Sequence, residues 1–245
     1  MRTRIPAPSL RTRAPRAALP SLLAAATTGA LLTGCTALPT DTRTEHHSYE
    51  LPDAVRALEV TNEGGDIEVT AAPAGSKVKV TEIVRFRRSA PATSHSVTSG
   101  TLRLTAAGCR ETGLSGCGVH LRIEAPQDVP VRLDSTGGDI IVRGHAASTS
   151  AKTGGGAISI EDSTAEDVVA HTDGGDITAR LTAAPRRISA TTDGGDVSVR
   201  VPAGPYALDV ASATGSRNVS VEDAASSPHK VQVHSKGGDV RVDTP

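Results

Sequence analysis

Two copies of the phrase Thr-Asp-Gly-Gly-Asp hold the carboxylates of this chain that are best placed to do chemistry. They put Asp173, Asp176, Asp193 and Asp196 on two turns whose corresponding residues lie 20 positions apart. If the turns stack at the spacing of neighbouring strands, about 4.8 Å, the four carboxylates converge and repel one another. Ca²⁺, which prefers oxygen ligands, would relieve that repulsion. The sequence therefore offers one candidate metal site.

The same aspartates have a simpler explanation as turn formers, because Asp side chains hydrogen-bond nearby backbone groups. Calcium-binding β-rolls repeat Gly-Gly-x-Gly-x-Asp about every nine residues. Here the aspartates recur at roughly twice that distance, and Ala157 and Arg217 interrupt the row. We therefore predict a protein without a metal or other cofactor, and calcium binding is the alternative.

The sequence lacks the common catalytic patterns. It contains no Gly-x-Ser-x-Gly, no His-Glu-x-x-His and no phosphate-binding loop. An enzyme acting on wall polysaccharide from a β-helix would need clustered acids, usually with aromatic rings for the sugar. The only aromatic residues are Tyr49, Phe86 and Tyr206. We predict that the protein is not an enzyme, with the polysaccharide enzyme as the alternative.

The charge balance argues against nucleic acid as a partner. Five of the 26 basic residues lie within residues 1–34, which contain no acidic residue, so 21 basic residues face 27 acidic ones in the remainder. Binding to phosphate backbones needs a basic surface. We expect no nucleic-acid partner.

Cys35 ends what reads as an export signal. Residues 1–16 carry five arginines, and residues 17–32 form an apolar stretch that is shorter than the about 20 residues of a spanning helix. The following Leu32-Thr33-Gly34-Cys35 resembles the bacterial lipobox, which implies cleavage before Cys35 and fatty acylation, such as palmitate, of that residue. We predict a lipoprotein signal peptide over residues 1–34 and an acylated cysteine with a polar tether over residues 35–50. The expected location is the extracytoplasmic face of the cell membrane.

Cys109 and Cys117 form the remaining pair of cysteines. An exported chain meets oxidising conditions, so a disulfide between them is expected. It would close a short loop and contribute about 2–3 kcal/mol. A redox or metal site is the alternative, but the spacing matches no common two-cysteine motif.

A Gly-Gly-Asp repeat must position these side chains. Around Gly194, apolar residues alternate with polar ones both before the glycines, at Ile188 and Ala190, and after them, at Val197 and Val199. This spacing of two is typical of β-strands, and the two glycines are expected to supply positive φ angles for a tight turn. The copies, one of them degenerate, begin at Asn62, Ser135, Thr153, Thr172, Thr192, Thr214 and Ser235.

One such unit, with two short strands, cannot bury its own apolar face, but stacked units bury a continuous aliphatic stripe. We predict an all-β domain over residues 51–245, either a β-solenoid or a flattened two-sheet stack of about 20-residue Gly-Gly-Asp repeats. An antiparallel β-sandwich made of successive hairpins is the alternative.

The first half of this domain is less regular. Strands are expected over residues 77–87, 101–105 and 119–124. The first of these carries Lys77, Lys79, Arg85 and Arg87, and Arg88 follows it directly. They could meet anionic wall polymers or lipid headgroups, or they could form a solvated edge that resists aggregation.

The Gly-Gly-Asp phrase with its alternating aliphatic residues resembles the bacterial "putative adhesin" family of β-strand repeats, over residues 51–245. The resemblance implies a β-repeat fold outside the membrane and brings no catalytic residues with it. Together with the lipobox, it leads us to expect a lipid-anchored protein with a binding, adhesin-like or scaffolding role at the cell envelope. A calcium-binding surface module is the alternative. The expected partners are the membrane and a wall polymer or envelope protein.

Overall fold

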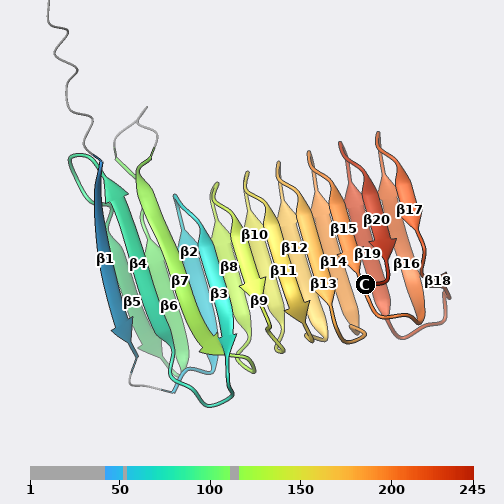
Figure 1. Cartoon of the computed structure of the whole chain (residues 1–245), viewed down its shortest axis with the longest axis horizontal. Helices are drawn as coiled ribbons and strands as arrows, with labels where there is room; N and C mark the ends of the chain where they lie inside the picture. Colours follow the sequence, from blue (N-terminus) through green and yellow to red (C-terminus); the bar gives the residue numbers. More distant parts are fainter. Residues whose placement is uncertain (1–41, 52–53, 111–115) are drawn as a thin grey trace, which may run out of the picture. The chain divides into compact units, whose positions relative to one another are not determined.

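In the computed structural model, the chain forms two ten-stranded β-sheets that lie face to face (Figure 1). The structure describes residues 42–51, 54–110 and 116–245, all within one compact unit of residues 39–245. These residues contain strands but no helix, and so no helix long and apolar enough to cross a membrane. The predicted signal peptide and Cys35 lie outside the described residues.

The first sheet contains, in spatial order, β1 (Arg43–Glu50), β4 (Lys79–Phe86), β7 (Gly118–Pro126), β3 (Ile67–Ala72), β9 (Ile140–Arg143), β11 (Ile158–Ser163), β13 (Ile177–Leu181), β15 (Val197–Arg200), β20 (Val240–Asp243) and β17 (Arg217–Val219). The second sheet contains β18 (Glu222–Asp223), β16 (Pro205–Ser212), β19 (Lys230–Ser235), β14 (Arg187–Thr192), β12 (Asp167–Thr172), β10 (Thr149–Thr153), β8 (Val131–Ser135), β2 (Ala57–Asn62), β6 (Thr101–Ala106) and β5 (Thr93–Thr98).

Most Gly-Gly turns join a strand of the second sheet to the following strand of the first. We call any such pair of consecutive strands a rung, whichever turn or loop joins them. Equivalent residues of neighbouring rungs pair in parallel register, as Ile158 does with Ile140 on one side and with Ile177 on the other. This confirms the flattened two-sheet stack of repeats. Antiparallel pairing is confined to β1 with β4, β4 with β7, and β5 with β6, so the described residues do not form a sandwich of successive hairpins.

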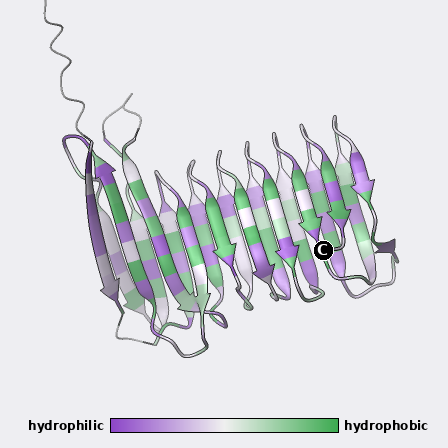
Figure 2. Ribbon diagram, in the orientation of Figure 1, coloured by the Kyte–Doolittle hydropathy of each residue, from purple (hydrophilic) through white to green (hydrophobic). Residues whose placement is uncertain are grey.

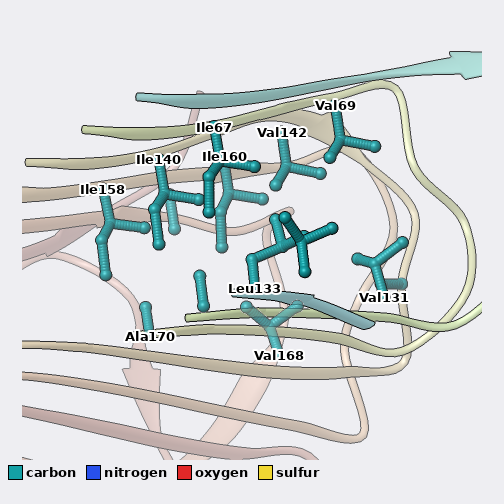
Figure 3. Packing of buried hydrophobic residues seen from close by; sticks show 14 of the residues in the cluster. Ile67, Val69, Val131, Leu133, Ile140, Val142, Ile158, Ile160, Val168 and Ala170 are labelled. Carbon is teal, nitrogen blue, oxygen red and sulfur yellow. The ribbon is translucent and has the colours of Figure 1, made fainter. Parts of the chain in front are cut away.

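Apolar and polar residues alternate along the strands (Figure 2). The buried apolar residues fill the space between the sheets, mostly with aliphatic side chains. Ile67, Ile140 and Ile158 lie in a row on the first sheet and face Leu133 and its neighbours on the second (Figure 3). All four side chains are almost completely buried. Burying one such side chain contributes about 1.5–3 kcal/mol, so the stack gains core with every rung added.

The order of rungs in space departs from the order in sequence at both ends of the stack. The rung β2–β3 lies between β6–β7 and β8–β9, and the last rung, β19–β20, lies between β14–β15 and β16–β17. At the first end, the chain forms the inner rung β2–β3 before the outer rung β6–β7. At the other end, it forms the outer rung β16–β17 and then returns to form the inner rung β19–β20. Simple stacking of successive repeats, as the sequence predicts, holds only from β8 to β15.

The polar tether expected over residues 35–50 is wrong for Arg43–Glu50, which form strand β1. All eight residues pair with β4 in antiparallel register. The strand lies at the edge of the sheet with exposed side chains, so it has no alternation of apolar residues that sequence reasoning could detect. Backbone pairing and the hydrogen bond from the Tyr49 hydroxyl to Glu82 hold it in place. The folded domain thus starts before residue 51.

The three strands expected in the irregular first half are confirmed. Residues 77–87 contain β4, residues 101–105 lie in β6 and residues 119–124 lie in β7.

His145, in the connection between β9 and β10, is the one histidine of the described residues that is fully buried. Its Nε2–H donates to the carbonyl oxygen of Val129 at 2.6 Å, and Nδ1 is buried without a partner. Burial lowers the pKa of His145, because the charged imidazolium loses its hydration, and the Val129 carbonyl and Asp128 oppose that effect only in part.

We expect His145 to make the fold sensitive to acid. The folded protein holds the imidazole neutral, so below the ordinary histidine pKa of about 6.5 the unfolded chain takes up the proton more readily. This contribution to stability is complete above that pH and is lost as the pH falls towards the lowered pKa. Urea unfolding between pH 8 and pH 5 should show a steeper loss of stability for the natural chain than for His145→Gln. Parallel pH profiles would contradict this.

Candidate functional site

The Gly-Gly-Asp turns line up along one edge of the stack and carry polar side chains that recur from rung to rung. We call this set of turns the turn edge. Asp176 accepts the backbone N–H of Asp196 through Oδ1 at 2.8 Å, and Asp196 in turn accepts the N–H of Asp239 at 2.7 Å. Equivalent bonds run from the N–H groups of Asp139, Ala157 and Ser216 to Asp66, Asp139 and Asp239. Each carboxylate therefore joins its own rung to the next.

The hydrogen bond at the end of this row has an electrostatic consequence. The backbone N–H of Ser216 holds the pKa of Asp239 below its ordinary value, because that bond stabilises the ionised carboxylate. Asp239 thus acts as a charged acceptor for a backbone amide.

The four candidate calcium ligands do not share one position. Asp176 and Asp196 bond to backbone amides, whereas Asp173 pairs with His171 at 3.1 Å and Asp193 pairs with Lys236 at 2.8 Å. In the part of the chain that the structure describes, no group of three or more His, Cys, Asp or Glu side chains is arranged to hold a metal ion. Protein groups already partner all four carboxylates.

A second ladder runs beside the carboxylates and was missed by sequence reasoning. The Thr172 hydroxyl donates to the carbonyl oxygen of Gly156 in the neighbouring rung at 2.9 Å, and it accepts the N–H of Gly175 in its own turn at 3.1 Å. Hydroxyls do the same in other rungs, at Thr153, Thr192, Ser212 and Ser235. The signal was present in the sequence, because the six regular copies of the repeat begin with Asn, Ser or Thr. In the degenerate copy the equivalent residue is Ser212, two residues before Thr214.

The second glycine of each pair is required for a different reason from the positive φ that the sequence analysis expects. Of these glycines only Gly65 has a φ in the left-handed region. A Cβ added at Gly175 or Gly195 would lie 2.0 or 2.2 Å from the carbonyl oxygen of the glycine one rung below. The neighbouring turn thus approaches so closely that no side chain fits.

Cys109 and Cys117 form the expected disulfide at the start of this edge, beside the turn of the β2–β3 rung. A cavity of about 290 Å³ adjoins it and is lined by residues including Arg85, His120 and Arg122. His120 Nδ1 lies 3.1 Å from Oδ2 of Asp66, so a histidine occupies the first position of the row in which other rungs have aspartate.

Ion pairs cover the outer face of the first sheet near this cavity. Glu68 pairs with Arg143 and with Arg122, and Arg143 also reaches Glu161. Partial burial acts to raise the pKa of Glu68, but the two guanidinium groups outweigh it and hold that pKa below its ordinary value. These exposed charges neutralise one another across neighbouring strands.

Glu82 is a buried carboxylate at the β1 end of the stack. It accepts hydrogen bonds from the hydroxyls of Tyr49 at 2.7 Å and Thr93 at 2.6 Å, and the ring of Tyr49 stacks on His95. Burial and the neighbouring Glu82 raise the pKa of Tyr49, so its hydroxyl remains a donor. The group links β1 and β4 of the first sheet to β5 of the second.

A larger cavity, of about 820 Å³, lies at the other end of the stack. Arg187 and Lys230 stand opposite each other on its wall. Its carboxylates already have protein partners, since Asp209 pairs with His234 and Asp223 accepts the N–H of Leu208. These lining residues include no hydroxyl or thiol that could act as a nucleophile.

We expect the two glycines of one turn to differ sharply in their tolerance of a methyl group. Gly195→Ala places Cβ against the Gly175 carbonyl and should cost at least about 3 kcal/mol in unfolding free energy. Gly194→Ala is the matched control, because its Cβ would lie 3.3 Å from the nearest atom and should cost under about 1 kcal/mol. Chemical denaturation measures both. Equal losses would contradict the close approach of the rungs.

The model of the family described as Toastrack DUF4097 matches residues 37–243. No curated protein matches the chain.

Several solved structures are similar. A "putative cell adhesion protein" from Clostridium sporogenes has 11% identity and a TM-score of 0.47, with 83% of this chain and 100% of that chain covered. A "putative adhesin" from Bacteroides fragilis has 14% identity and a TM-score of 0.45, with 83% and 98% covered. Another from Parabacteroides distasonis has 13% identity and a TM-score of 0.37, with 82% and 98% covered.

Proposed function

The chain belongs to the Toastrack DUF4097 family, and from this premise we propose that it is a non-catalytic β-repeat protein that binds or scaffolds at the cell envelope. In this proposal, acyl chains on Cys35 hold it on the extracytoplasmic face of the membrane. Its partner is a wall polymer or another envelope protein.

The observation that carries a non-catalytic role is how the polar groups are used. The carboxylates and hydroxyls of the turn edge bond to backbone groups of adjacent rungs. A catalytic acid or base has to be free to exchange a proton with substrate. These side chains already serve the fold, so they support a structural role for the repeated motif.

The outer faces of the sheets support binding over an extended surface. On the first sheet, Ser159, Thr178 and Ser198 stand side by side in register on three neighbouring strands, and Arg180 and Arg200 form a parallel row. Strands are about 4.8 Å apart, so equivalent side chains recur along the stack at a fixed interval. A repeating polymer or a partner strand matches such a surface better than a small metabolite does.

The sequence of the first 35 residues supports the anchor. The basic start, the apolar stretch and Leu32-Thr33-Gly34-Cys35 follow each other in the order of a lipoprotein signal. More than one acyl chain is needed for stable attachment to a bilayer, because a single chain binds only marginally.

Labelling of cells with an alkyne analogue of palmitate tests the anchor. The natural chain should take up label and sediment with membranes, and Cys35→Ala should lose the label. Cys109→Ser/Cys117→Ser is the matched control, because it removes two thiols of the domain and should keep the label. Label that persists in Cys35→Ala, or natural protein that stays in the cytosol after fractionation, would overturn the proposed attachment.

A further inference from the structure

Five arginines gather at the end of the stack where the chain enters the folded domain. Arg43 starts β1 and pairs with Phe86, the last residue of β4; Arg85 precedes Phe86, and Arg87 and Arg88 follow it. Arg110 follows Cys109, whose disulfide partner precedes Gly118, the residue opposite Arg85. In Figure 1 the start of β1 and the arrowhead of β4 lie at the same end of the strands. We call these five residues the arginine cluster.

Within the described residues, the arginine cluster contains most of the arginines that have no acidic partner. The described residues hold sixteen arginines, and eight of them form ion pairs with Asp or Glu. Among the described residues, no ion pair joins a member of the arginine cluster. Four of its members are exposed, and Nε of the half-buried Arg87 is buried without a hydrogen-bond partner.

Unpaired like charges repel one another, and nothing in the core explains their presence, since an edge strand can be protected with far fewer charges. Such a group is stable beside a surface that supplies negative charge. Guanidinium groups bind phosphate oxygens with two parallel hydrogen bonds, which makes phosphate the chemical group that fits best.

The short length of chain between Cys35 and β1 favours lipid headgroups as the source of that phosphate. Seven residue steps separate Cys35 from Thr42, the first described residue, and an extended chain spans at most about 3.6 Å per residue. With Cys35 acylated, the start of β1 must therefore remain within about 25 Å of the bilayer surface. This short segment therefore keeps the start of β1, with Arg43, near the headgroups, and the end of β4 lies at the same end of the strands.

We infer that the arginine cluster is a docking surface for anionic phospholipid headgroups, which sets how the domain stands on the membrane. This inference rests on the proposed anchor at Cys35 for its geometry. The binding itself uses side chains of the folded domain alone, so it can be measured without the anchor.

The test uses the mature chain, residues 35–245, expressed without the signal so that Cys35 is not acylated, and with its free thiol alkylated. Residues 39–245 form one compact unit with their own core, so this chain folds independently of the anchor. Co-sedimentation with vesicles of equal parts phosphatidylglycerol and phosphatidylcholine should exceed that with phosphatidylcholine alone, and salt should abolish the difference.

Arg85→Gln/Arg87→Gln/Arg88→Gln should lower the partition coefficient on the anionic vesicles at least about tenfold, because each basic residue near such a surface contributes a factor of about five. Lysines at the same three positions should retain the binding. Arg56→Gln/Arg187→Gln/Arg217→Gln is the matched control, since it removes three arginines that lie outside the cluster and make no ion pair with Asp or Glu, and it should bind like the natural chain.

Equal binding by the cluster variant and the natural chain would overturn the inference, and so would an equal loss in the control variant. Binding to immobilised polyphosphate but not to the vesicles would also overturn it, because that result would assign the cluster to a phosphate polymer. None of these results bears on acylation of Cys35, which the labelling of cells measures separately.

Discussion

The structure depends on how closely one Gly-Gly turn approaches the next. At the second glycine of the turn, the Cα of one rung lies over the carbonyl group of its neighbour, and a single methyl group would overlap that oxygen. This approach lets the aspartate of one turn reach the backbone N–H of the next, and lets the Thr or Ser hydroxyl reach the next carbonyl. Polar backbone groups that a turn would otherwise leave to water are satisfied by the adjacent rung. The aliphatic core and the turn edge therefore impose the same register.

Both ends of the stack carry additional structure that covers the core of the terminal rungs. A terminal rung exposes core on one side and can fray. Here the first and last rungs of the sequence, β2–β3 and β19–β20, are both covered by a further rung. At one end, antiparallel strands and the buried Glu82 group close the core. At the other, Arg217 donates to the carbonyl oxygen of Val210 and Asp223 accepts the N–H of Leu208, so side chains occupy part of the free edge of β16.

The sequence was a good guide wherever the repeat is regular. Alternating aliphatic residues and a near-constant period predicted the strands from β8 to β15 and their stacking, and the cysteine count of an exported chain predicted the disulfide. Sequence reasoning failed where pairing between strands distant in the sequence decides which residues form strands and in which order the rungs stack. β1 has no apolar pattern because its side chains are exposed, and the exchange of rung order at both ends depends on which strand edges remain free, which no local pattern encodes. For the candidate site, the repeated residues were identified correctly, but the role of the glycines was not. Close approach of two backbones and a positive φ both demand glycine, and only coordinates distinguish them.

The row of turn aspartates is interrupted at Ala157, and this interruption allows the hydrogen bonds between neighbouring rungs to be tested directly. The N–H groups of Asp196 and Asp239 bond to carboxylates of the neighbouring rung, whereas the rung before Asp176 has Ala157, whose methyl group accepts no hydrogen bond. Native-state hydrogen exchange at these amides therefore compares turns of one kind within one molecule. If hydrogen bonds from backbone N–H groups to aspartate carboxylates join the rungs, the amides of Asp196 and Asp239 exchange about tenfold or more slowly than that of Asp176. Equal exchange rates at all three positions would contradict it.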